Sequence, residues 1–195
     1  MKGSHMTTTI EPSGWRRNPW PLVLWATPTA LLVAPVVAMQ FTGEVQWSPF
    51  DFVFAAVLLY GAAGTVDLAI RRGGSMAYRL GAGLAVLVSF LLIWVNGAVG
   101  VIGDEDNPAN LMFIAIIVIA AAGAIAARFE ARGMARAMTI ACVLNAAIAA
   151  LVPVYGWGAD EHPGMPGLVA LIGLFATIWG LSAALFAKAA RDDSK

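Results

Sequence analysis

The sequence predicts an all-α membrane protein in which six transmembrane helices form one polytopic bundle. Three observations lead to this fold class. The 195 residues are 59% hydrophobic and only 12% charged, whereas about a quarter of the residues in a soluble domain are charged. The apolar residues form six long continuous runs. Connections rich in Lys and Arg alternate along the chain with connections rich in Asp and Glu.

The six runs are long enough to be membrane-spanning helices. A hydrocarbon core about 30 Å thick requires roughly 20 apolar residues in a helix. The strands of a membrane barrel would instead alternate polar and apolar residues in short segments. We therefore expect helices at about residues 20–41, 50–70, 78–102, 111–129, 134–155 and 168–187.

The chain is expected to contain one membrane domain, residues 18–190. Residues 1–6 are typical of a cloning scar. Residues 7–17 and 191–195 are then a short N-terminal segment and a short tail. The connections leave no room for a soluble domain, so successive helices should be antiparallel neighbours.

An inverted repeat of three plus three helices would give the two halves opposite topology. When Phe90–Trp94 is aligned with Phe175–Trp179, identical residues coincide at both ends of the segment and at other apolar positions. A shared richness in Ala, Leu and Val also explains such matches. The repeat is therefore a hypothesis.

The basic residues predict the orientation of the bundle, because Lys and Arg beside membrane helices remain on the cytoplasmic side. The connections on one side contain Arg71, Arg72, Arg79, Arg128, Arg132 and Arg136, and Lys188, Arg191 and Lys195 follow the last helix. The opposite connections contain carboxylates but no Lys or Arg. We expect both termini to be cytoplasmic.

The acidic side contains the most conspicuous candidate site. Its residues are Asp104, Glu105, Asp106, Asn107 and Asn110 in one connection, and Asp160, Glu161 and His162 in another. Carboxylate and amide oxygens suit hard cations such as Ca²⁺ or Mg²⁺, so one interpretation is a cation-binding vestibule. The other is helix capping, because Asn107-Pro108 and Ser48-Pro49-x-Asp51 resemble helix starts.

A few polar residues fall inside the predicted helices. Asp67 precedes Arg71 by one helical turn, so it is either a local ion-pair partner or an ion-coupling group. Asn96 and Asn145 either join helices by hydrogen bonds or line a polar path. That path would also include Thr139 and Thr177.

Pro28 and Pro35 lie inside the first predicted helix. Each removes a backbone donor, so a kink is expected there. A gating hinge is the functional interpretation, and the tolerance of membrane helices for proline is the structural one.

Several classes of function are excluded or disfavoured. Cys142 is the only cysteine, and His162 is the only histidine outside the cloning scar. An intrachain disulfide, a Cys-rich metal site and a bis-histidine heme are therefore excluded. No lysine lies inside a predicted helix, which excludes a retinal Schiff base. We expect no cofactor and no nucleic-acid partner; membrane lipids are the expected partners, with a cation or a second copy of the chain as alternatives.

A resemblance adds little to this interpretation. Val95–Gly97, Asp106–Met112, Ala127–Phe129 and Arg132–Arg136 are similar to segments of small uncharacterised bacterial inner-membrane proteins. The resemblance implies a multi-pass protein of the bacterial inner membrane. It implies no activity and assigns no residue a role.

Three functional hypotheses remain. The first is a small transporter or channel-like protein for a cation or small polar solute, motivated by the acidic side and the prolines. The second is a non-catalytic membrane scaffold or sensor that binds lipid or a partner between its helices. The third is an intramembrane enzyme acting on a lipid. An enzyme is not expected, because Asp67 is the only carboxylate inside an apolar segment.

Overall fold

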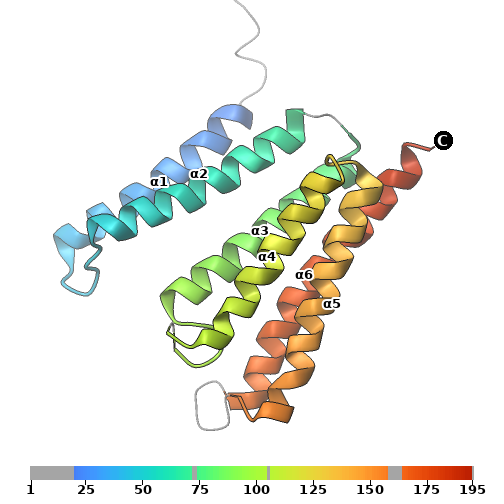
Figure 1. The fold of residues 1–195 in the computed structure, drawn as a ribbon. Coiled ribbons are helices and arrows are strands. Elements are labelled where there is room, and N and C mark those ends of the chain that lie inside the picture. The colour runs from blue at the N-terminus through green and yellow to red at the C-terminus, as the bar shows by residue number, and fades with distance from the viewer. Residues whose placement is uncertain (1–19, 72–73, 105, 158–163, 195) are drawn as a thin grey trace, which may run out of the picture. The chain divides into compact units, whose positions relative to one another are not determined.

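The computed structural model describes residues 20–71, 74–104, 106–157 and 164–194, which form helices and connections without any strand (Figure 1). The elements are α1 (Trp20–Phe41), α2 (Pro49–Arg71), α3 (Met76–Ala98), the short 3-10 helix η2 (Pro108–Asn110), α4 (Leu111–Ala126), α5 (Ala131–Tyr155) and α6 (Gly164–Asp192). Within these residues, six helices are long and apolar enough to cross a membrane. The predicted all-α class and helix number are confirmed for the described chain.

The contacts divide the chain into two units, residues 1–56 and 57–195. In the first unit, α1 is an uninterrupted helix that includes Pro28 and Pro35. The start of α2 is a capping box, since the Ser48 backbone N–H donates to Asp51 Oδ2 at 2.7 Å and the Asp51 N–H donates to Ser48 Oγ at 3.3 Å. The predicted cap is confirmed, whereas a hinge at the prolines stays a prediction.

The second unit contains a four-helix bundle. In it α3 contacts α4 and α6, while α5 contacts the same two helices (Figure 1). Small residues allow close approach at three of these contacts. A Cβ at Gly81 would lie 3.2 Å from the Phe186 ring, one at Gly123 would meet Ala137, and one at Gly180 would lie 3.3 Å from Cys142 Sγ. Small residues therefore set how closely these helices approach.

The centre of this bundle is apolar and filled by large side chains. Val88, Leu92, Phe113, Ile172 and Phe186 are fully buried. Ser182 is also buried, and its Oγ donates to the Gly81 carbonyl at 2.8 Å. That bond joins α6 to α3 at the point where Gly81 allows the two backbones to approach.

Two helices end earlier than the sequence predicts. The predicted helix 111–129 stops at Ala126, because Arg128 (φ 49°) and Phe129 (φ 62°) adopt left-handed conformations. The Phe129 N–H donates to the Ala124 carbonyl and the Arg128 N–H to that of Ile125, which forms a Schellman cap. The predicted helix 78–102 stops at Ala98, because the following loop turns at Gly100 (φ 72°).

Candidate functional site

The acidic loop between α3 and α4 is closed by one buried side chain, Asn110. Its Oδ1 accepts from the N–H groups of Val101 at 3.0 Å and Ile102 at 2.9 Å. Its Nδ2 donates to the carbonyls of Ile102 at 3.2 Å and Asp104 at 2.7 Å. An amide oxygen has two lone pairs, and both are used here. Asn110 therefore orders the loop, and both lone pairs of its side-chain oxygen are used within that loop. A vestibule role for this residue stays a prediction.

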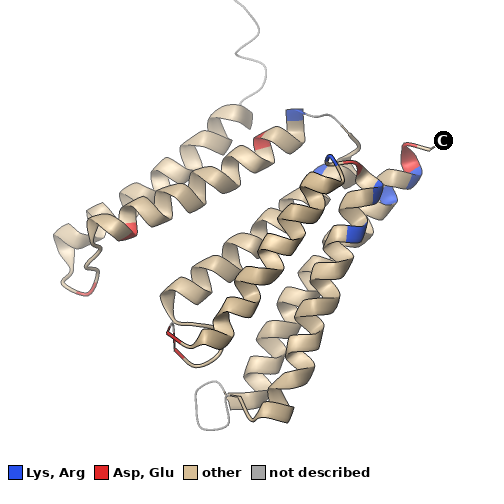
Figure 2. Cartoon of the chain, viewed as in Figure 1, with Lys and Arg blue, Asp and Glu red and all other residues tan. Residues whose placement is uncertain are grey.

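The neighbouring polar residues also have local roles or face outward. Asn107 caps η2, because its Oδ1 accepts from the Ala109 N–H at 2.9 Å, as the capping interpretation predicts. Asp104 and Asp106 are exposed at the acidic end of the bundle (Figure 2). Among the described residues, no group of three or more His, Cys, Asp or Glu side chains is arranged to hold a metal. Glu105, Asp160, Glu161 and His162 lie outside the described residues.

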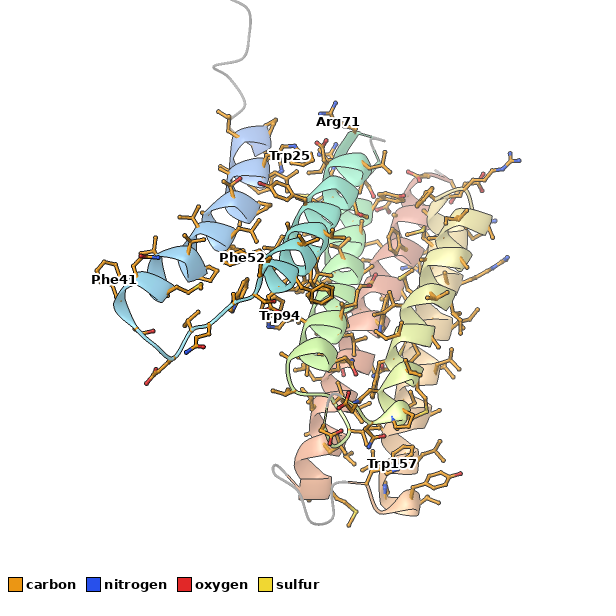
Figure 3. All side chains as sticks on the ribbon, turned by 60° about the vertical axis from the view of Figure 1, so that its left-hand side comes forward. Trp25, Phe41, Phe52, Arg71, Trp94 and Trp157 are labelled. Carbon is orange, nitrogen blue, oxygen red and sulfur yellow. The ribbon has the colours of Figure 1, made fainter. Side chains whose placement is uncertain are left out.

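Asp67 forms the local ion pair expected from its spacing. Its Oδ2 accepts from Arg71 Nε at 2.7 Å, with 70% of the Arg71 side chain and 17% of the Asp67 side chain exposed. Arg71 ends α2 at the opposite end of the second unit from Trp157 (Figure 3). Asp67 is therefore compensated by an exposed partner near the end of its helix.

The two intramembrane asparagines are buried in the bundle. Asn145 Nδ2 donates to the Ile172 carbonyl at 2.8 Å and joins α5 to α6. Asn96 Nδ2 donates to the Leu92 carbonyl of its own helix at 2.6 Å. The Oδ1 atoms of both residues and Trp179 Nε1 are buried, with no hydrogen-bond partner in the described chain.

Thr139 and Thr177 are not part of a path with these asparagines. Both are exposed on the bundle surface, and their hydroxyls donate to the carbonyls of Ala135 and Gly173, one turn back in the same helix. The structure does not bring together the predicted polar path of Asp67, Asn96, Thr139, Asn145 and Thr177.

A groove of about 460 Å³ lies instead within the second unit, lined mainly by α3, α4 and the part of α2 from Val57 on, with Met134 and Met138 of α5 and Trp179 of α6. Its lining is almost entirely Ala, Leu, Val, Ile, Phe and Met. The three hydroxyls on its wall are already engaged: Thr65 donates to the Gly61 carbonyl, Ser89 to that of Ala85, and Tyr78 to that of Phe129. The groove thus presents mostly hydrocarbon, although Trp179, whose Nε1 has no partner in the described chain, also lines it.

A second pocket of about 640 Å³ lies in the same unit, lined by residues at the start of α3, in the α4–α5 turn, at the start of α5 and at the end of α6. Four charged side chains line it: Arg128, Glu130, Arg132 and Asp193. Within the described chain, Glu130, Arg132 and Asp193 form no ion pair. This pocket is polar, in contrast to the groove.

The groove and the polar pocket share two wall residues, Tyr78 and Phe129. Tyr78 Oη donates to the Phe129 carbonyl at 2.8 Å, which links α3 to the α4–α5 turn. The apolar groove therefore ends where the polar pocket begins. The sequence analysis predicts neither the groove nor the polar pocket. For the polar pocket the available signal is the mixed-charge run Arg128-Phe-Glu-Ala-Arg132, whose arginines serve there only to predict orientation.

The fold and the charge distribution define a membrane protein with six helices of transmembrane length in its described residues. No protein-family model, curated protein or solved structure matches the chain. The candidate function must therefore be inferred from the groove and the polar pocket.

Proposed function

We propose that this protein binds a membrane lipid, with a hydrocarbon chain of that lipid lying in the groove beside α2, α3 and α4. It acts as a lipid-binding scaffold or sensor and has no chemical step. The bundle crosses a bacterial inner membrane with its basic end and both termini in the cytoplasm. The observation that carries the proposal is a mostly apolar groove whose three wall hydroxyls all donate their protons to backbone carbonyls.

The lining favours hydrocarbon over a polar solute for an energetic reason. A polar solute would have to leave water and would find few partners on the wall, because the wall hydroxyls donate their protons to backbone carbonyls and only Trp179 Nε1 among the lining side chains is a donor without a partner in the described chain. Each unmade bond costs about 1–3 kcal/mol. A hydrocarbon chain makes no hydrogen bonds with water and therefore loses none on entering the groove. A volume of about 460 Å³ also falls within the range of about 300–1,000 Å³ that is usual for small-molecule sites.

Transport of a cation or small polar solute is the competing proposal. It is favoured by the buried Oδ1 atoms of Asn96 and Asn145, for which the described residues supply no donor. Such oxygens would suit a cation or a water molecule in the bundle interior. Flux into liposomes equal to that of empty vesicles, across a panel of cations and osmolytes, would remove this alternative.

A groove-filling variant tests the lipid proposal directly. Gly61 lines the groove, and a Cβ added there meets no atom within 4 Å, so Gly61→Phe should place a ring in the groove without a backbone clash. Gly83 offers a matched control, because its added Cβ also meets nothing within 4 Å and it does not line the groove. The measurement is the amount of phospholipid that remains bound per protein after gentle solubilisation.

We expect the wild-type protein and Gly83→Phe to retain stoichiometric lipid. Gly61→Phe should retain about tenfold less, equivalent to about 1.4 kcal/mol of binding free energy. Thermal unfolding of all three proteins in detergent controls for misfolding. Equal retention by Gly61→Phe and the wild type, or no lipid on any of them, would refute the proposal.

A further inference from the structure

The groove follows two helices over most of its length. On α3, residues three or four positions apart line it from Tyr78 to Ile93, a length of about 22 Å at about 1.5 Å per residue. On α2, a similar stripe of lining residues extends from Val57 to Ala69, a length of about 18 Å. The groove is therefore long and narrow, and it runs along these helices.

The two ends of the groove differ. On α3 its lining starts at Tyr78, in the first turn of the helix, where the Tyr78 hydroxyl donates to the α4–α5 turn. At the other end the lining stops at Ile93, about 7 Å before α3 ends at Ala98. The Phe90 ring lines this far end and stacks on Trp94, with ring centroids 6.0 Å apart. The groove thus reaches the basic end of the bundle and stops short of the acidic end.

The length of the groove sets the length of the chain that fills it. An extended chain of C–C bonds of about 1.5 Å, with angles of about 111°, advances about 1.25 Å per carbon. The stripes on α2 and α3 therefore match about 14 to 18 carbons. Half of the hydrocarbon core is only about 15 Å thick. A chain that fills the groove from the basic end is thus extended and passes the middle of the membrane.

The volume of the groove gives the number of chains. A methylene group is similar in size to a water molecule, whose share of the liquid is about 30 Å³, so the groove holds about 15 such groups in its volume of about 460 Å³. This is one acyl chain. The second chain of a phospholipid would remain in the surrounding bilayer.

We propose that the groove holds a single extended acyl chain of about 14 to 18 carbons from a lipid whose polar part lies at the basic end. Phe90 closes the far end and limits the length of the chain. This inference rests on the proposed lipid binding and adds the number, length and direction of the bound chain.

The test places a ring part of the way along the groove. Gly61 lies about 12 Å along α2 from Ala69, which limits the stripe at the basic end. Gly61→Phe therefore leaves room for about 10 carbons on the basic side and blocks the remainder. The full chain, delipidated in detergent, is titrated with didecanoyl and dipalmitoyl phosphatidylglycerol, which share a head group, and native mass spectrometry measures the bound fraction. Relative to the wild type, Gly61→Phe should bind dipalmitoyl lipid about tenfold more weakly and didecanoyl lipid within about twofold.

A ring nearer the basic end should exclude both lipids. Thr65 lies one turn from Ala69 on the same stripe, so Thr65→Phe should weaken both by about tenfold. Thr65→Val is the matched control, because it removes the hydroxyl that donates to the Gly61 carbonyl and adds no bulk to the groove. Thr65→Val and Gly83→Phe should bind both lipids as the wild type does.

Phe90→Ala tests the far end of the groove. It should bind dibehenoyl phosphatidylglycerol, whose chains are longer than the groove, about threefold more tightly than the wild type does, and dipalmitoyl lipid equally well. Phe50→Ala is the matched control, because Phe50 also stacks on an aromatic ring, that of Phe54, and does not line the groove. Unchanged binding of the dibehenoyl lipid to Phe90→Ala would refute the closing role of Phe90.

The outcomes separate this inference from the lipid-binding proposal. If Gly61→Phe weakens both lipids equally, the length and direction of the chain are overturned while lipid binding stands. If the wild type binds neither lipid, or if Gly61→Phe weakens neither, the proposed lipid site itself fails. A dimer that disappears in Gly61→Phe would place a second copy of the chain in the groove and overturn both. Gly61→Leu repeats the comparison if Gly61→Phe unfolds at a lower temperature than Gly83→Phe.

Discussion

The acidic and basic ends of the second unit are built in opposite ways. At the acidic end, the α3–α4 loop is closed on itself, because Asn110 uses its amide oxygen and nitrogen on the backbone of that loop. At the basic end, four charged side chains line one pocket, and three of them form no ion pair in the described chain. The comparison teaches that the residue types of a loop do not by themselves show whether its polar side chains are engaged by the backbone.

The largest effect is expected from Asn110→Ala, which removes the group that closes the acidic end. The N–H groups of Val101 and Ile102 would lose their acceptor in a buried position. At about 1–3 kcal/mol for each unsatisfied group, the free energy of unfolding should fall by about 3 kcal/mol or more. Thermal unfolding in detergent measures it.

Asn107→Ala is the matched control, because it removes only a helix cap from the same loop and should cost about 1 kcal/mol. An Asn110→Ala protein as stable as the wild type would show that this amide is not structural. The acidic loop would then again be a candidate ligand site.

Tyr78→Phe sharpens the comparison at the basic end. It removes the hydrogen bond from Tyr78 Oη to the Phe129 carbonyl and keeps the ring that packs against Phe186. We expect the free energy of unfolding to fall by about 1 kcal/mol. Lipid binding should be unchanged, because this hydroxyl donates to a backbone carbonyl between the groove and the polar pocket. Tyr155→Phe, at an exposed tyrosine, should change neither quantity. Lost lipid binding in Tyr78→Phe would instead mean that the hydroxyl contacts the lipid.

Asp67→Asn should have a small effect, although Asp67 is the carboxylate that the sequence places inside an apolar helix. Its partner, Arg71, is exposed, and exposed ion pairs contribute roughly 0.2–1 kcal/mol. We expect a change in unfolding free energy below about 0.5 kcal/mol that becomes smaller still at high salt. A loss several times larger, independent of salt, would assign Asp67 a role beyond this pair.

The smallest effect is expected from replacing both Asp104 and Asp106 by Asn. Both side chains are exposed and neither is needed to close the loop. Stability should stay within about 0.5 kcal/mol of the wild type, as for most surface substitutions, and lipid binding should be unchanged. If millimolar Ca²⁺ stabilises the wild type and not this variant, the loop is a cation site after all.

The sequence predicts those features of the fold that depend on local chemistry. Membrane-length helices follow from apolar runs, and the caps at Ser48 and Asn107 follow from residue types at fixed spacing. The ion pair between Asp67 and Arg71 follows from the helical repeat. Each of these is decided within a few residues of chain.

Features that depend on rare backbone conformations or on tertiary packing do not follow from the sequence. Arg128 and Phe129 adopt left-handed conformations that side-chain-bearing residues rarely take, so the predicted end of α4 was three residues too late. Nothing local indicates that Asn110 turns inward while Asp104 faces outward. Tyr78 and Phe129 are distant in sequence, and only the bundle places them between the groove and the polar pocket.

The most direct test of the account measures lipid and cation on one sample. Native mass spectrometry of the gently solubilised wild-type protein, with and without Ca²⁺, Mg²⁺ or Mn²⁺, reads both ligands at once. The account predicts one bound phospholipid that is lost in Gly61→Phe and no stoichiometric divalent cation. A stoichiometric cation that disappears when Asp104 and Asp106 are replaced, on a protein that carries no lipid, would contradict it.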